Sequence, residues 1–110
     1  MIIAIPLAGG KLAAHFGHCQ EFALLDVQNN EVQSKQLVEP PAHEPGVLPR
    51  WLSEQGVTVI IAGGMGQRAL TLFNQYGINV VVGAPAETPE DLIQGYLDDS
   101  LATGVNLCDH

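Results

Sequence analysis

Residues 57–82 decide the fold of this chain, and they read VTVIIAGGMGQRALTLFNQYGINVVV. Residues 57–62 and 78–82 are almost continuously apolar, as is typical of strands buried on both faces of a sheet. Between them, residues 67–76 carry apolar side chains at helical spacing, and Gly77 is well placed to end that helix. A strand, a helix and a second strand in this order predict two parallel strands joined by a helical crossover.

Three further strands extend this pair into a larger sheet, one at residues 2–7 and two that form a hairpin at 21–27 and 31–38. A short helix is expected at residues 47–55. Asn29-Asn30 is a tight-turn signal between the two hairpin strands. Thr88-Pro89 followed by two acids is typical of the start of a last helix. We therefore expect an α/β domain with a three-layer, ribonuclease H-like mixed sheet of five strands in the order 3-2-1-4-5, with helices on both faces.

The length fits a single domain over residues 1–110, with an irregular tail at residues 102–110. No apolar run approaches the ~20 residues that a membrane span needs, and the N-terminus lacks the basic region of a signal peptide. We therefore expect a cytoplasmic protein without a membrane partner. The net charge of -8, from 4 Lys and Arg against 12 Asp and Glu, argues against a nucleic-acid partner, whose phosphates need cationic side chains.

The candidate site follows from the predicted topology. Open α/β sheets bind ligands beyond the carboxyl ends of their strands, where the connections diverge to opposite sides. Two loops should meet there, the one after the first strand and the one after residues 57–62. The predicted cofactor-binding residues on these loops are Lys11, His15, His18, Cys19, Gly63, Gly64, Met65, Gly66 and Arg68.

The residue types in these loops point to an anion and to a soft metal. A glycine-rich loop that opens a helix offers free N–H groups and a positive dipole end to an anion, although it is also compatible with a tight turn that binds nothing. It matches neither the P-loop nor the dinucleotide-binding pattern. His15, His18 and Cys19 are candidate metal ligands, because imidazole and thiolate suit iron, copper, zinc and iron–sulfur species. Cys108 and His110 add the same ligand types at the C-terminus, where their position relative to the site is open.

Cys19 is the residue that we expect to matter most. It lies in a segment with several glycines and no clear apolar period, so we expect a loop with little regular hydrogen bonding that is mobile without ligand. A helix N-terminus and Arg68 beside it would favour the thiolate form. Replacement of Cys19 should then abolish metal binding and leave the fold intact.

Catalysis finds little support in the sequence. A nuclease on this type of fold needs clustered carboxylates that start on the first strand, and residues 2–7 contain none. The chain also lacks the nucleophile elbow of a serine hydrolase. We therefore expect a binding protein and not an enzyme.

Three stretches together resemble the dinitrogenase iron–molybdenum cofactor biosynthesis family, which includes NifX-like carriers and the C-terminal domain of NifB. They are His15-Phe16-Gly17-His18-Cys19, residues 44–52 and residues 60–69, and the closing Cys108-Asp109-His110 is similar to small stand-alone members. The resemblance implies a ribonuclease H-like fold and binding of iron–sulfur or iron–molybdenum cofactor precursors. The leading hypothesis is a non-catalytic carrier of such an anionic cluster, with cluster-donor or cluster-acceptor proteins as partners. The alternative is an anion- or metallate-responsive regulatory module that acts through a partner protein.

Overall fold

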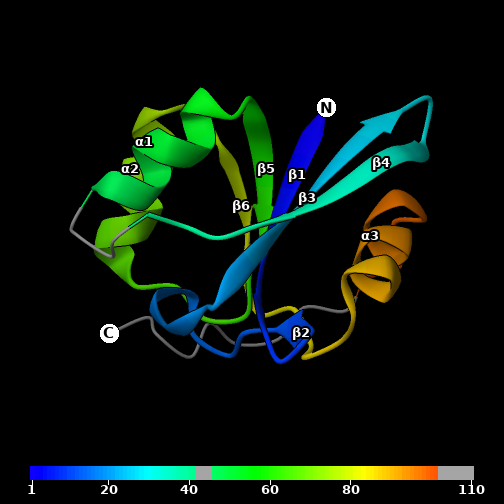
Figure 1. Ribbon diagram of the computed structural model, residues 1–110, viewed down its shortest axis with the longest axis horizontal. Coiled ribbons are helices and arrows are strands. Elements are labelled where there is room, and N and C mark those ends of the chain that lie inside the picture. The colour runs from blue at the N-terminus through cyan, green and yellow to red at the C-terminus, as the bar shows by residue number, and fades with distance from the viewer. Residues whose placement is uncertain (42–45, 102–110) are drawn as a thin grey trace.

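The computed structural model describes residues 1–41 and 46–101. Figure 1 shows the elements in chain order: β1 (Ile2–Ala8), β2 (Lys11–Leu12), the 3-10 helix η1 (Phe16–His18), β3 (Glu21–Gln28), β4 (Glu31–Val38), α1 (Val47–Glu54), β5 (Val57–Ile61), α2 (Gln67–Gln75), β6 (Asn79–Val81) and α3 (Pro89–Leu97). Within this part of the chain, none of the helices has the length and apolar character needed to cross a membrane.

The strands form one mixed sheet in the order β4-β3-β1-β5-β6, with β2 paired to β1 off this path. The β1–β5 and β5–β6 pairs are parallel, whereas the β1–β3 and β3–β4 pairs are antiparallel. The sheet therefore has six strands and not the five that we expected, and its numbered order differs from the predicted one because β2 was missed. Gly9 and Gly10, both with positive φ, turn the chain back so that Lys11 and Leu12 pair with the end of β1.

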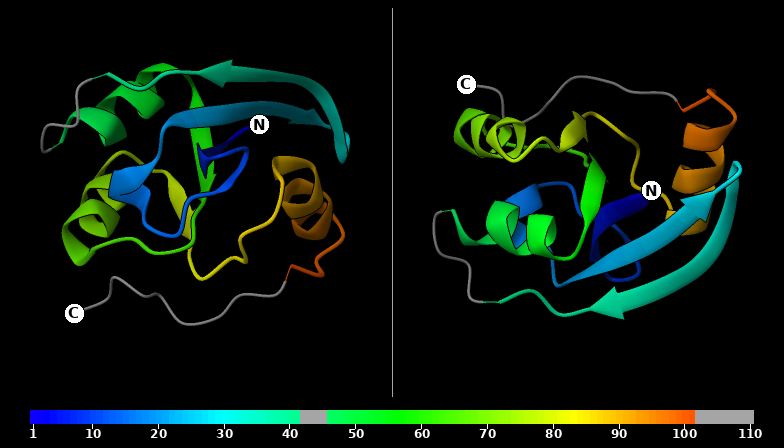
Figure 2. Two further views of the ribbon diagram at one scale, coloured as in Figure 1. Left: turned by 60° about the horizontal axis from the view of Figure 1, so that its bottom comes forward. Right: turned by 90° about the horizontal axis from the view of Figure 1, so that it is seen from above.

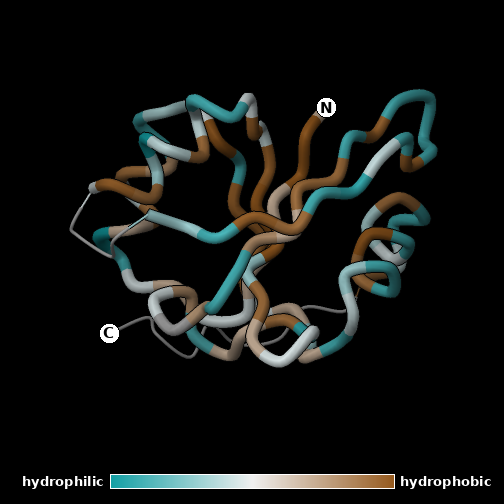
Figure 3. Tube along the Cα trace, in the orientation of Figure 1, coloured by the Kyte–Doolittle hydropathy of each residue, from teal (hydrophilic) through white to brown (hydrophobic). Residues whose placement is uncertain are grey.

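The sheet lies between two helical layers, with α1 and α2 on one face and α3 on the other (Figures 1 and 2). Side chains of β1 alternate between these faces, so Ala4 belongs to the buried cluster under α1 and α2, and Ile3 and Ile5 belong to the cluster under α3. Figure 3 shows the apolar residues gathered along the central strands. Burial of each large aliphatic side chain contributes roughly 1.5–3 kcal/mol to folding, so these two clusters hold the layers together.

The turns and helix ends that local sequence signals predict are present in the structure. Asn29 and Asn30 have φ values of 53° and 64°, as a tight turn between antiparallel strands requires. Thr88 caps α3, since its Oγ1 accepts a hydrogen bond of 3.3 Å from the backbone N–H of Asp91. Gly77 follows α2 with a φ of 73°, which favours glycine at a helix end.

The edge strand β4 has a bulge near its start. The pairing of Asp26 with Ser34 is followed by that of Val27 with Val32, which leaves Gln33 as the extra residue. The Gln33 Nε2 donates to the carbonyl oxygens of Gln28 and Glu31, both at 3.3 Å. Further along the strand, Lys35 reaches across to α3, where its Nζ lies 3.0 Å from Oε2 of Glu90.

Candidate functional site

The loops after β1 and β5 meet at the carboxyl edge of the sheet. The backbone N–H of Phe16 donates to the carbonyl oxygen of Gly64, and the N–H of Gly64 donates to that of Ala14, both at 2.8 Å. His15 and Gly64 thereby form a parallel β-bridge beyond the ends of the two strands. The predicted meeting of these loops is confirmed, and it follows from the adjacency of β1 and β5.

A third loop, after β6, joins the same edge. The N–H of Gly83 donates to the carbonyl oxygen of Gly63 at 2.6 Å, and the N–H of Leu12 donates to that of Glu87 at 2.9 Å. At the other end of the segment, the N–H of Gln20 donates to the carbonyl oxygen of Leu7 at 2.7 Å. The expectation of little regular hydrogen bonding between Lys11 and Cys19 is therefore wrong, because β2, η1 and these long-range bonds fix much of the segment.

Gly63 is needed for the close approach of two of these loops. A Cβ at this position would lie 3.0 Å from the carbonyl oxygens of both Ala13 and Ala14. These are backbone atoms, and the Ala14 oxygen accepts a hydrogen bond from Gly64 while the N–H of Ala13 donates to Pro6, so they cannot move aside cheaply. Gly66 differs, since a Cβ there would meet none of the described atoms within 4 Å. Packing thus accounts for the glycine at 63 without a ligand, but it does not account for the one at 66.

The N-terminus of α2 is open to solvent. Gly66, Gln67 and Arg68 are exposed, and no side chain of the described residues caps the helix. Its first turn therefore presents backbone N–H groups, the positive end of the helix dipole and the Arg68 guanidinium to the same region of solvent. This combination suits an anion.

Phe16 holds η1 against α2. Its ring meets that of Phe73 edge-on with 5.4 Å between centroids, and it lies 6.0 Å from the ring of Phe22. No role was predicted for Phe16 from the sequence, although an apolar ring between two histidines is a signal for packing. The contact brings the histidine-bearing segment beside the helix that carries Arg68.

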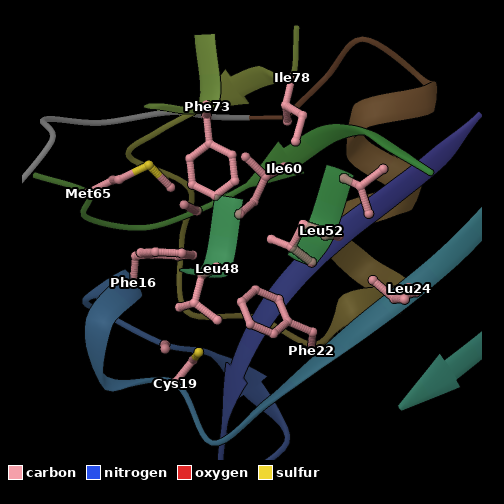
Figure 4. Close-up of a cluster of buried hydrophobic side chains, with 14 residues drawn as sticks. Phe16, Cys19, Phe22, Leu24, Leu48, Leu52, Ile60, Met65, Phe73 and Ile78 are labelled. Atoms are coloured by element: carbon pink, nitrogen blue, oxygen red, sulfur yellow. The ribbon is translucent and has the colours of Figure 1, made fainter. Parts of the chain in front are cut away.

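Cys19 is buried in the core and does not face the α2 N-terminus. Its exposed fraction is 6%, and it packs in the cluster under α1 and α2 that also contains Phe16, Phe22 and Leu48. Figure 4 shows its sulfur directed toward Leu48. Burial raises the pKa of the thiol from its ordinary value of 9.0 to about 11, although a backbone hydrogen bond lowers the pKa slightly in opposition. The expectations of a favoured thiolate and of a residue outside the core are wrong, because the turn of η1 points Cys19 inward.

The remaining predicted residues are spread around this edge. Lys11 is exposed on β2, His15 is partly exposed in extended backbone, and Met65 is buried with an exposed fraction of 1%. His18 is the last residue of η1. Cys108 and His110 lie outside the described residues. Among the residues described, no group of three or more His, Cys, Asp and Glu side chains is arranged to hold a metal ion.

Comparison with known proteins identifies the family. A sequence model of the dinitrogenase iron-molybdenum cofactor family matches residues 1–99. This chain belongs to that family. The match ends just after α3, so the predicted ligands Cys108 and His110 lie outside the matched segment as well.

Relatives of this dinitrogenase iron–molybdenum cofactor family protein span most of its length. The uncharacterized protein MJ0580 of Methanocaldococcus jannaschii is 34% identical in an alignment 85 residues long that covers 73% of this chain and 72% of the relative. The crystal structure of PH0822 is similar with a TM-score of 0.89 and 29% identity over 96% of each chain. The apo form of the orange protein from Desulfovibrio gigas shares the fold, with a TM-score of 0.78 and 21% identity over 96% of this chain and 93% of that one.

Proposed function

We propose that this protein is a non-catalytic carrier of an anionic iron–sulfur or iron–molybdenum–sulfur cluster, or of a precursor of one. The observation that carries the proposal is the open first turn of α2, which bears Arg68 and lies at the same sheet edge as the His15–Gly64 bridge. Membership of the dinitrogenase iron–molybdenum cofactor family supports the class of cargo.

Electrostatics favours an anion at this place and at few others on the chain. The net charge is -8, so most of the surface repels an anionic cluster. At the first turn of α2, the backbone N–H groups and Arg68 act together, and charge-assisted hydrogen bonds of this kind are about twice as strong as neutral ones. We propose that these groups hold the cluster sulfides and that an imidazole of His15 or His18 supplies a reversible bond to the metal.

The arrangement suits release as well as binding. A carrier must hand its cargo to another protein, which a closed cage of four thiolates would oppose. Cys19 is held as a neutral, buried thiol, so in this conformation the cargo is held by backbone, guanidinium and imidazole groups. We propose cluster-donor and cluster-acceptor proteins as the partners in that exchange.

The test is metal retention after anaerobic incubation with ferrous iron, sulfide and tetrathiomolybdate, followed by desalting and metal analysis. Wild type should retain iron or molybdenum, and Arg68→Gln should bind at least about fivefold more weakly through loss of a charge-assisted contact. Arg50→Gln is the matched control, because Arg50 is exposed on α1 and its replacement changes the net charge equally. His15→Ala should also weaken retention.

Three outcomes would contradict the proposal. Retention of no iron or molybdenum under any of these conditions would remove the cluster as cargo. In parallel incubations with molybdate or phosphate, retention of one of these anions alone would favour the metallate-responsive module instead. An equal loss in Arg68→Gln and Arg50→Gln would mean that net charge, and not the α2 first turn, governs binding.

A further inference from the structure

A groove runs along the C-terminal half of α3, on the opposite face of the sheet from α2. It consists of two adjoining hollows, one of about 440 Å³ that includes Val81 of β6 and one of about 340 Å³ that includes Glu87. Gly95 and Leu101 line both hollows. We call this surface the α3 groove.

The larger hollow of the α3 groove has an apolar floor that is incompletely covered, and the smaller hollow is lined mainly by polar residues. Val81, Tyr96, Leu97 and Leu101 pack against the buried cluster on this face, and each remains partly exposed. Leu101 sits directly on the helix, since a Cβ at Gly95 would lie 3.3 Å from its Cα. Leu101 lines both hollows, so it offers apolar surface to a partner in each of them.

The rim of the α3 groove is acidic. Its carboxylates are Glu87, Asp91, Asp98 and Asp99. The Nε2 of Gln94 donates to Oδ2 of Asp98 at 3.0 Å, which holds that carboxylate at the edge of the groove.

The chain offers little of its own to neutralise this rim. Residues 69–110 contain no Lys or Arg. Lys35, the cation that contacts α3, is already paired with Glu90 at 3.0 Å. The N-terminal ammonium of Met1 also lines the larger hollow, where it donates to the Val27 carbonyl oxygen at 3.1 Å and lies 4.0 Å from Oδ1 of Asp26. The groove thus combines partly exposed apolar side chains with an excess of negative charge.

We propose that the α3 groove binds a cationic segment of another protein in which Lys or Arg side chains alternate with apolar ones. Charge complementarity favours this occupant over a second copy of the chain and over the chain's own residues 102–110. A second copy of this chain would bring a further net charge of -8, and residues 102–110 contain no Lys or Arg to pair with the rim.

The position of the groove suits a protein that exchanges cargo with this one, although the proposal of a docking surface does not depend on the identity of the cargo. The sheet separates it from the α2 first turn, so a partner here leaves that turn open. The backbone oxygen of Glu87, on the rim, accepts a hydrogen bond from Leu12 in the segment that leads to His15. A docked protein would therefore lie next to the candidate site without covering it.

The probe is a twelve-residue peptide of alternating Lys and Leu, compared with peptides in which Ser replaces Leu or Glu replaces Lys. Binding to the full chain is measured by calorimetry and by changes in backbone amide NMR shifts. The double variant Asp98→Asn, Asp99→Asn removes one carboxylate from each hollow. The double variant Glu31→Gln, Glu54→Gln is the matched control, since both residues are exposed on β4 and α1 and the net charge changes equally.

We expect the Lys-Leu peptide to bind, with shift changes concentrated at Gly95, Tyr96 and Leu101. The Asp98, Asp99 variant should bind at least about fivefold more weakly, and the control variant should stay within about twofold of wild type. The proposal is overturned if the Lys-Ser peptide binds as tightly, if both double variants lose affinity equally, or if the shift changes spread over the whole surface. Self-association of the unliganded chain that the Asp98, Asp99 variant abolishes would overturn it too, since a second copy would then occupy the groove.

Discussion

The burial of Cys19 predicts a thiol that reacts slowly and contributes to folding. With a pKa of about 11 in place of 9.0, the thiolate fraction at pH 7 is about a hundredfold lower than that of an ordinary cysteine. In a Cys108→Ser background, Ellman's reagent should therefore modify the native protein at least about a hundredfold more slowly than the urea-unfolded protein. A native rate within about tenfold of the unfolded rate would refute the burial of this side chain.

The same burial gives the sign and size of its effect on stability. Cys19→Ala removes one buried atom and leaves a small cavity, at a cost of about 1 kcal/mol. Cys19→Ser keeps the volume but buries a hydroxyl in an apolar cluster, at a cost of about 1–3 kcal/mol. Urea unfolding should therefore place the serine variant below the alanine variant, and both below wild type. Equal stability of all three proteins would show that the side chain lies outside the core.

The pH dependence follows from the direction of the pKa shift. Because the pKa is raised in the folded protein, folding favours the neutral thiol, and this contribution is complete below pH 9.0 and is lost as pH rises toward 11. Wild type should lose about 2 kcal/mol relative to Cys19→Ala between pH 8 and pH 10.5. A stability difference between the two proteins that stays constant over this range would refute the shift.

Four other substitutions test the loop contacts, the α3 cap and the surface ion pair by urea unfolding. Gly63→Ala forces two backbone oxygens to shift and should cost about 2–3 kcal/mol. Gly66→Ala should cost less than about 1 kcal/mol, because the poorer N-cap is offset by the lower entropy of alanine in the unfolded chain, and similar losses in both variants would contradict the close approach of the loops. Thr88→Ala removes the α3 cap and should cost about 1 kcal/mol, so an unchanged midpoint would show that the cap is dispensable. Lys35→Ala breaks an exposed ion pair and should cost less than about 1 kcal/mol, and this cost should shrink in high salt. A larger cost that does not depend on salt would contradict this assignment.

The sequence predicted those parts of the fold whose signals are local. The Asn29-Asn30 turn and the Thr88 cap depend on neighbouring residues, and both are present. The parallel strands around α2 follow from apolar runs of the right length, and their adjacency to β1 brings the two predicted loops together.

The prediction failed for the short segment between β1 and β3. β2 forms at the Gly9-Gly10 turn, which pairs Leu12 with Leu7, so a local signal was missed there. The place of η1 depends instead on the packing of Phe16 against Phe73, which is far away in sequence. The inward direction of Cys19 follows from the same contacts, which is why the prediction of a favoured thiolate failed, whereas Arg68 does lie at a helix start as predicted.

The bulge at Gln33 has a consequence for how this protein meets its neighbours. An edge strand of eight residues is a template onto which another chain can add a strand, and such addition leads to aggregates. A straight incoming strand would have to flatten the bulge and break both hydrogen bonds of Gln33, at roughly 0.5–1.5 kcal/mol each, and would also meet the charge of Lys35. The β4 edge of the sheet is therefore a poor template for the addition of strands from other copies of the chain.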